Sequence, residues 1–287
     1  MPEAVIVSAV RTAIGTARKG TLADTTPEEL ARVVLGESIE RSGLSRELVD
    51  DVVFAESQYG GGAVARHAAV EVGLLHVGGQ AVNRHCAGSL TSVGIAAGSI
   101  KSGMDRAVIA GGVQSASLSP KLQRRVPGTD DEFVAWHPPT HPDSPEAPNM
   151  DMSISVGWNT AKEAGLTRED QDAWALRSHE RAIAAIDAGL FVDEIVPIKA
   201  LRKDGSYVDF AVDEHPRRGS TMEKLAALKV LHPEIEGFSV TAGNASGVND
   251  AAAALVIMDA DLAAAEGLTP LATIRSWRSR RRWSGPG

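Results

Sequence analysis

Short apolar runs alternate with helix-like segments along the first 116 residues, and this alternation limits the fold more than any other feature. Such alternation is typical of a sheet covered by helices. It predicts an α/β fold: a mixed, mainly parallel sheet with helices on both faces. The strand-like runs are AVIVSAV (4–10), VDDVVFAES (49–57), QAVNRHC (80–86) and RAVIAGGVQ (106–114).

The predicted helices carry start and stop signals. Thr26 is suited to cap the segment that starts at Pro27, and Gly43 is suited to end it. Farther along, Thr167 and Asp170 have the spacing of a capping box, with Gly189 as the stop. A further helix is expected from Gly88 to about Ser102.

The character of the sequence changes near residue 117. Residues 117–151 are polar and proline-rich, and a loop of this length is usually functional or part of an interface. Helical and strand-like pieces follow before the α/β pattern resumes. The sequence therefore predicts one α/β domain made of 1–116 and 245–268, with an inserted α+β domain at 117–244.

Composition excludes several classes of protein. The formal net charge of −8 does not favour nucleic acid or an anionic membrane as a partner. No apolar run approaches the roughly 18 residues of a membrane span. The N-terminus predicts a first strand rather than a signal peptide, and one cysteine cannot form an internal disulfide. A cytoplasmic location is the simplest expectation.

Cys86 is the only cysteine in 287 residues, and it lies between a predicted strand and a predicted helix. The free N–H groups and partial positive charge of a helix start favour a thiolate and can stabilise an oxyanion. Such a site suits acyl transfer through a thioester. A lone cysteine is also often a buried spectator, and these features alone leave the two alternatives balanced. Gly94 and Gly98 predict close packing of the helix against a neighbour.

Four segments together resemble the thiolases, the family of acetyl-CoA acetyltransferases and 3-ketoacyl-CoA thiolases. They span residues 4–268 in the order found in that family. The segments are VSAVRTAIG, NRHCAGSLTSVGIAAGSIKSGMDRAVIAGGVQSAS, MSISVGWNTAKEAGLTREDQDAWALRSHERAIAAIDAGLFVDEIVPI and FSVTAGNASGVNDAAAALVIM.

The resemblance implies roles for four residues. Cys86 would be the cysteine that becomes acylated, and Ser246 would contact the pantetheine arm of coenzyme A. Arg217 would lie near the nucleotide end of coenzyme A, and Met152 would flank the acyl pocket. Coenzyme A and acyl-CoA would be substrates, with no tightly bound cofactor and no metal.

The sequence departs from the family pattern in two places. The segment CAGSL exchanges the glycine and serine that usually follow the cysteine. Segments typical of the second α/β half, with its catalytic histidine and second cysteine, do not occur. Residues 269–287 are interpreted as the start of a truncated C-terminal domain and an atypical basic tail, RSRRRWSGPG, as a frameshift or truncated gene model would give.

These departures predict impaired activity for the isolated chain. None of its histidines is expected to replace the missing base, and His85 is expected to point away from Cys86 as a strand neighbour. A homo-oligomer (dimer or tetramer), or a partner supplying the missing half, is expected. The alternatives are a non-catalytic acyl-CoA- or lipid-binding protein, a partner subunit, or a ketoacyl synthase, which the thiolase-like segments disfavour.

Overall fold

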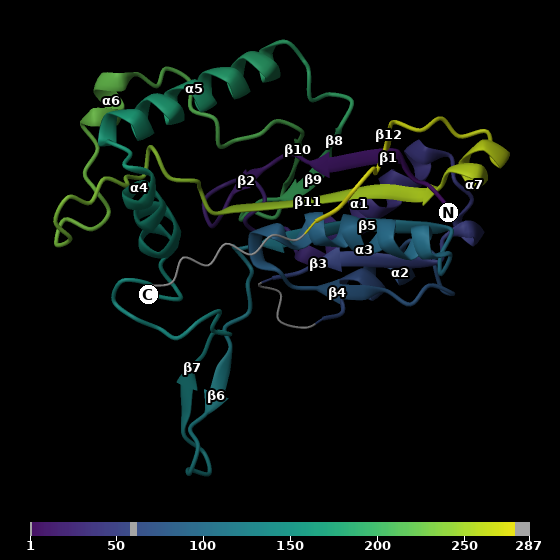
Figure 1. The fold of residues 1–287 in the computed structure, drawn as a ribbon, viewed down its shortest axis with the longest axis horizontal. Coiled ribbons are helices and arrows are strands. Elements are labelled where there is room, and N and C mark those ends of the chain that lie inside the picture. The colour runs from purple at the N-terminus through teal and green to yellow at the C-terminus, as the bar shows by residue number, and fades with distance from the viewer. Residues whose placement is uncertain (1, 58–61, 279–287) are drawn as a thin grey trace.

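A computed structural model describes residues 2–57 and 62–278 of the chain, and a mixed sheet forms its centre (Figure 1). The strands are β1 (Ala4–Thr12), β2 (Gly15–Thr16), β3 (Asp51–Ala55), β4 (Gln80–Val82), β5 (Ala107–Ser115), β8 (Ile195–Val196), β11 (Asn249–Asp259) and β12 (Ala272–Thr273). Their order is β12-β1-β11-β5-β3-β4, with β2 paired to β11 and β8 to β1. Strands β3, β4 and β5 are mutually parallel, whereas β11 is antiparallel to both β5 and β1.

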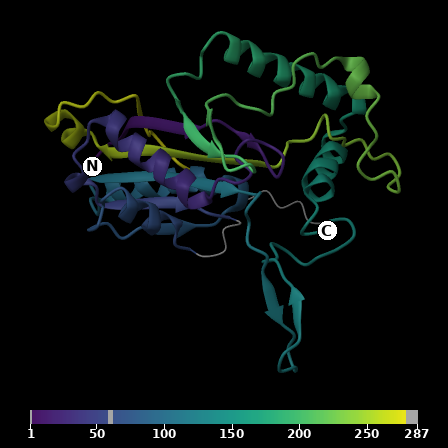
Figure 2. The same cartoon turned by 180° about the vertical axis from the view of Figure 1, so that it is seen from behind.

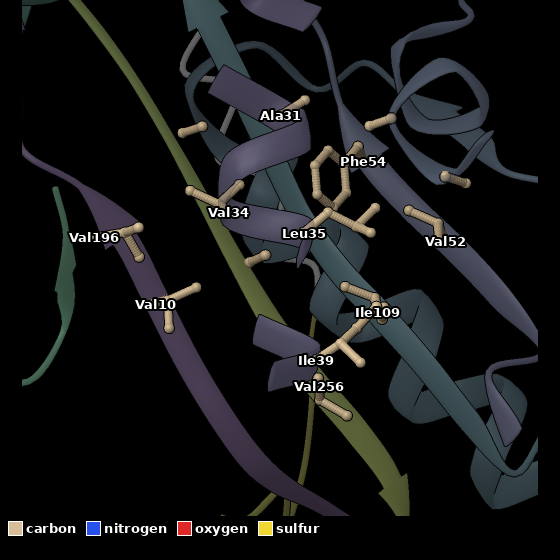
Figure 3. Packing of buried hydrophobic residues seen from close by; sticks show 14 of the residues in the cluster. Val10, Ala31, Val34, Leu35, Ile39, Val52, Phe54, Ile109, Val196 and Val256 are labelled. Atoms are coloured by element: carbon tan, nitrogen blue, oxygen red, sulfur yellow. The ribbon is translucent and has the colours of Figure 1, made fainter. Parts of the chain in front are cut away.

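Helices cover both faces of this sheet, as the sequence predicted. Helices α1 (Pro27–Ser42) and α2 (Val64–Glu71) pack with the larger core cluster, which includes Leu35 and Phe54 (Figure 3). Helix α3 (Gly88–Ser102) packs on the opposite face through a smaller cluster that includes Ile100. A last short helix, α7 (Ala260–Ala265), follows β11. The prediction of an α/β fold with helices on both faces is confirmed.

The predicted helix ends are also confirmed. The Thr26 hydroxyl accepts a hydrogen bond from the Glu29 amide, and Gly43 ends α1 in the left-handed conformation with φ 72°. Helix α5 (Arg168–Asp187) begins with the capping box of Thr167 and Asp170. Each signal satisfies backbone groups that a helix end leaves without a partner.

The segment between β5 and β11 holds several small elements besides α5. Strands β6 (Gln123–Arg125) and β7 (Phe133–Ala135) form a hairpin that extends away from the sheet in both views (Figures 1 and 2). The sequence had predicted only a polar loop there. The other elements are a π-helix (Ser153–Trp158), α4 (Asn159–Ala164), β9 (Ile198–Leu201), β10 (Tyr207–Phe210) and α6 (Met222–Ala226).

A charged network joins this segment to β1. The Arg11 guanidinium donates to Asp213 Oδ1 at 2.8 Å and to Glu194 Oε1 at 2.7 Å. The next carboxylate, Glu214, accepts from the backbone amides of Thr16 and Thr21. Because the Asp213 side chain is only 9% exposed, its pairing with Arg11 is screened less than a surface ion pair would be. The network therefore fixes residues 194–214 against the first strand.

The chain crosses the outer face of α3 near its C-terminal end. After β12, Lys101 Nζ donates to the Ile274 carbonyl at 2.6 Å, and Trp277 lies so close to Gly94 that a Cβ there would collide with its indole. Nothing lies within 4 Å of a Cβ built on Gly98. Close packing thus occurs at Gly94 but not at Gly98. The predicted strand at 271–277 is reduced to two residues, and the basic tail from 279 lies outside the described residues.

The start of α3 packs closely on the sheet. A Cβ added to Gly88 would lie 2.7 Å from Ala55 Cβ. One added to Gly112 on β5 would collide with the Ser89 hydroxyl and lie 2.9 Å from Ala55 Cβ. The backbone of α3 therefore approaches β3 and β5 at the end of the helix that follows Cys86.

Because of this packing, substituting alanine for Gly112 and for Gly98 should change the free energy of unfolding in opposite directions. Gly112→Ala should lower the free energy of unfolding by about 1–3 kcal/mol, because the methyl group overpacks the α3 contact. Gly98→Ala, a helical position with open space, should raise it by about 0.4–1 kcal/mol. Urea unfolding measures both. Equal effects of the two substitutions would contradict the close approach at Gly112.

Candidate functional site at the sheet edge

Cys86 lies in a turn between β4 and α3. Strand β4 ends at Val82, earlier than predicted, and a 3-10 turn spans His85–Ala87 before α3 begins. The Asn83 side chain accepts the His85 amide proton at 3.0 Å, and His85 has φ 46°. These local bonds replace strand pairing, so the chain bends and Cys86 is exposed.

The turn corrects one expectation about the helix start. The Ala87 amide donates to the Arg84 carbonyl at 3.1 Å, and the Gly88 amide donates to the His85 carbonyl. These two N–H groups are therefore not free to bind an oxyanion. The axis of α3 still begins directly after Cys86, so the partial positive charge of the helix start remains close to the sulfur.

The expectation that His85 points away from Cys86 assumed that both residues lie in a strand. Because His85 and Cys86 both lie in the 3-10 turn, the alternation of strand side chains does not apply to them. Within residues 2–57 and 62–278, Cys86 Sγ has no hydrogen-bond partner. His76 instead bonds the Val49 carbonyl through Nε2, and His67 pairs with Glu71 on its own helix.

Sheet topology brings Ser246 to the edge where Cys86 lies. Parallel strands β3, β4 and β5 end at this edge, and antiparallel β11 begins there, since Asp250 pairs with Ser115. Polar contacts also connect the Cys86 turn to it. Asn83 Nδ2 donates to the Ser57 carbonyl, and Ser57 Oγ donates to Gln114 Oε1 at 3.2 Å. Ser246 is exposed three residues before β11 begins.

A glycine contact joins the Ser246 turn to the Arg217 segment. A Cβ on Gly247 would collide with the His215 ring, so only glycine allows this approach. Two residues later, the Arg217 amide donates to His179 Nδ1 on α5 at 3.3 Å. The pKa of His179 lies below its usual value, mainly because the ring is partly buried and also because His215 and Arg217 are close. A neutral ring can accept that amide proton.

Met152 is 50% exposed and lies just before the π-helix. Its neighbours hold it in place: Asp151 Oδ1 accepts from the Ser153 amide at 2.9 Å, and Asp151 Oδ2 accepts from His232 Nε2 at 2.9 Å. Short stretches with π-helical bonding occur frequently at functional sites.

Contacts made by other residues thus connect the Cys86 turn to the sheet edge and the Ser246 turn to the Arg217 segment, whereas the Met152 segment is held separately by the Asp151–His232 contact. In the described part of the chain, no hydrogen bond joins one of the four predicted side chains to another. The linking residues His179, His215 and His232 were not found from the sequence, because their partners lie far away along the chain. Only His232 also has a partner close in the sequence, Glu234 in LHPEIE.

Residues 2–57 and 62–278 support neither a metal site nor a membrane-spanning helix. No group of three metal-binding side chains could hold an ion there. None of the helices in this part is both long and apolar enough to cross a bilayer.

Comparison with known proteins identifies the family. Residues 4–261 match the family model "Thiolase, N-terminal domain". The chain is 41% identical to an acetyl-CoA acetyltransferase of Escherichia coli and 38% identical to one of Pseudomonas aeruginosa. Each alignment covers 97% of this chain. It covers 71% of the Escherichia coli protein and 72% of the Pseudomonas aeruginosa protein.

A solved structure agrees with these matches. The acetyl-CoA acetyltransferase of Bacillus anthracis superposes with a TM-score of 0.83 at 36% identity, over 95% of this chain and 69% of that one. Fold, family model and relatives all agree with the resemblance noted in the sequence. The chain belongs to the thiolase family of acyltransferases.

Proposed function

We propose that Cys86 is the nucleophile of a thiolase-type acyl transfer. Its sulfur would attack the thioester carbonyl of an acyl-CoA. A new bond forms from Sγ to the carbonyl carbon, the bond from that carbon to the coenzyme A sulfur breaks, and coenzyme A leaves as the thiol with the proton from Cys86. The acyl group would then pass to another coenzyme A molecule or to a carbanion in a Claisen condensation.

One observation carries the proposal: the single cysteine is exposed in a turn that ends a parallel strand and starts α3. A buried structural cysteine would not occupy this position. The close contact of Gly88 and Gly112 with Ala55 fixes the turn relative to the sheet. Ligands of α/β sheets commonly bind outside the carboxyl ends of the strands, which is the edge that holds Cys86.

Coenzyme A would bind along the inserted segment. Ser246 Oγ, three residues before β11, would bond the pantetheine arm, and the exposed Arg217 guanidinium would pair with a phosphate of the nucleotide end. The contact of Gly247 with His215 supports a continuous binding surface between these positions. Met152 would lie beside the acyl group. The division into an α/β domain (1–116, 245–268) and an insertion (117–244) belongs to this proposal.

The 287-residue polypeptide would perform the acylation step slowly and the carbon–carbon step not at all. A positioned general base is worth about 10²–10⁴-fold, and no described residue bonds the Cys86 sulfur. The condensation requires a second cysteine, whereas this sequence contains one. The same lack of a base favours a second candidate, a non-catalytic acyl-CoA-binding protein.

Oligomerisation, a cytoplasmic location and a role in fatty-acid metabolism are further parts of the proposal. The hairpin of β6 and β7 exposes Phe133 (57%) and Val134 (49%) away from the sheet, which supports a contact with another subunit. The single cysteine is compatible with a reducing compartment.

Acylation tests the proposed nucleophile. Incubation with acetyl-CoA should add one acetyl group to the chain, which intact-mass spectrometry detects and peptide mapping assigns to Cys86. Cys86→Ala should stay unmodified. Binding of acetyl-CoA without any modification of Cys86 would favour the non-catalytic alternative, and turnover at ordinary thiolase rates would contradict the incomplete-site proposal.

The role of Arg217 is tested with a full ligand and a truncated one. Arg217→Ala should weaken coenzyme A binding about fivefold, since one exposed charge-assisted contact contributes roughly 1 kcal/mol. It should leave binding of pantetheine, which has no nucleotide, unchanged. Calorimetry on this variant and on the exposed control Arg202→Ala makes the comparison. Equal loss for both ligands would rule out a nucleotide contact.

A further inference from the structure

His232 lies between two carboxylates and bonds both of them. Its Nε2 is 2.9 Å from Asp151 Oδ2, and its Nδ1 is 2.8 Å from Glu234 Oε1. The ring is 21% exposed and packs edge-on against Phe238, with 5.0 Å between centroids. Since a carboxylate only accepts hydrogen bonds, both contacts are satisfied when both ring nitrogens carry protons.

The ring joins two segments that the proposed function uses. One segment is Asp151–Ser153, which carries Met152. The other runs from Leu231 and His232 toward the Ser246 turn, and the Leu231 amide donates to the Val240 carbonyl within it at 2.9 Å. The contact with Asp151 spans 81 positions in the sequence, so it fixes tertiary structure rather than a local turn.

A hydrolytic triad is a rival explanation of the same atoms. Ser153 Oγ lies 3.1 Å from His232 Nε2, and Glu234 bonds the other ring nitrogen, which gives the order serine, histidine, acid. However, the Ser153 hydroxyl donates to Asp151 Oδ1 at 2.5 Å. His232 Nε2 also lies 2.9 Å from Asp151 Oδ2, and a carboxylate oxygen can only accept a proton from it. A ring protonated on both nitrogens cannot take a proton from serine, so the arrangement fits positioning rather than catalysis.

We propose that His232, Asp151 and Glu234 form a protonation-dependent clamp that holds Met152 beside the acyl group of the bound thioester. His232 acts in it as a positioning residue. The clamp rests on the proposed function, because Met152 has an acyl group to contact only if the chain binds acyl-CoA. Residues 151–153 would be held while the ring is cationic and released when it is neutral.

The direction of the pH dependence follows from the surroundings of the ring. The hydrogen bond to Glu234 contributes most to raising the pKa of His232 above its usual value of 6.5. Burial of the ring opposes this increase, and the charge and hydrogen bond of Asp151 add to it. Asp151 and Glu234 are the charged groups that act on the ring in the described part of the chain. The clamp is therefore intact below the usual pKa of histidine and is lost as pH rises through the raised value.

Methyl NMR tests the clamp without any activity measurement. In the full chain labelled on methionine methyl groups, the Met152 signal is assigned with Met152→Leu and followed from mildly acidic to mildly alkaline pH. It should shift with the titration of the His232 ring. His232→Gln should remove the shift, and the exposed neighbour control Glu236→Gln should retain it. A Met152 signal that stays constant through the wild-type His232 titration overturns the clamp, whatever the variants do.

Ligand binding tests the acyl contact separately. In the Cys86→Ala background, affinity for acetyl-CoA should fall roughly 2- to 12-fold through the same titration, the range of one net hydrogen bond, while affinity for coenzyme A changes much less. Equal pH dependence for the two ligands overturns the placement of Met152 beside the acyl group. If neither ligand binds but the Met152 signal still titrates, the proposed function and the acyl contact fail, and the protonation-dependent hold on residues 151–153 is supported.

Discussion

The antiparallel pairing of β11 with β5 is the interaction on which the rest of the structure depends. It runs from Asp250 opposite Ser115 to Met258 opposite Ala107. Because the two strands adjoin, the segment between them leaves and re-enters the sheet at the same edge. Ser117 and Asp250, 133 positions apart, bond each other there. The Cys86 turn lies at that edge, so one pairing brings Cys86 to the end of the sheet where the segment proposed to bind coenzyme A begins.

Elements with local signals could be predicted from the sequence. Thr26, Gly43, Thr167 and Asp170 act within a few residues of themselves, and the helices they delimit have the predicted ends. The strand before Cys86 was predicted too long: its pairing ends at Val82, and the Asn83 side chain bonds the His85 amide instead. The β6–β7 hairpin was not predicted because its sequence is polar and rich in turn residues.

The candidate site was only partly predictable, because the contacts within it have no local signal in the sequence. The resemblance to thiolases is the basis on which roles are proposed for Cys86, Ser246, Arg217 and Met152. It could not give the contacts that arrange them. The Gly247–His215 approach, the Arg217–His179 bond and the His232 clamp each join residues more than 30 positions apart, and no spacing rule connects such pairs. These contacts explain how exposed side chains on separate segments could form one binding surface.

The central claim is that Cys86 and the coenzyme A-binding residues belong to one site, and alkylation protection tests it directly. The rate at which iodoacetamide modifies Cys86 is measured with and without saturating coenzyme A, using mass spectrometry. Coenzyme A should slow the alkylation, and pantetheine, which would occupy the place of the pantetheine arm, should slow it as well. An unchanged rate while calorimetry shows coenzyme A bound would place the ligand elsewhere and contradict the account.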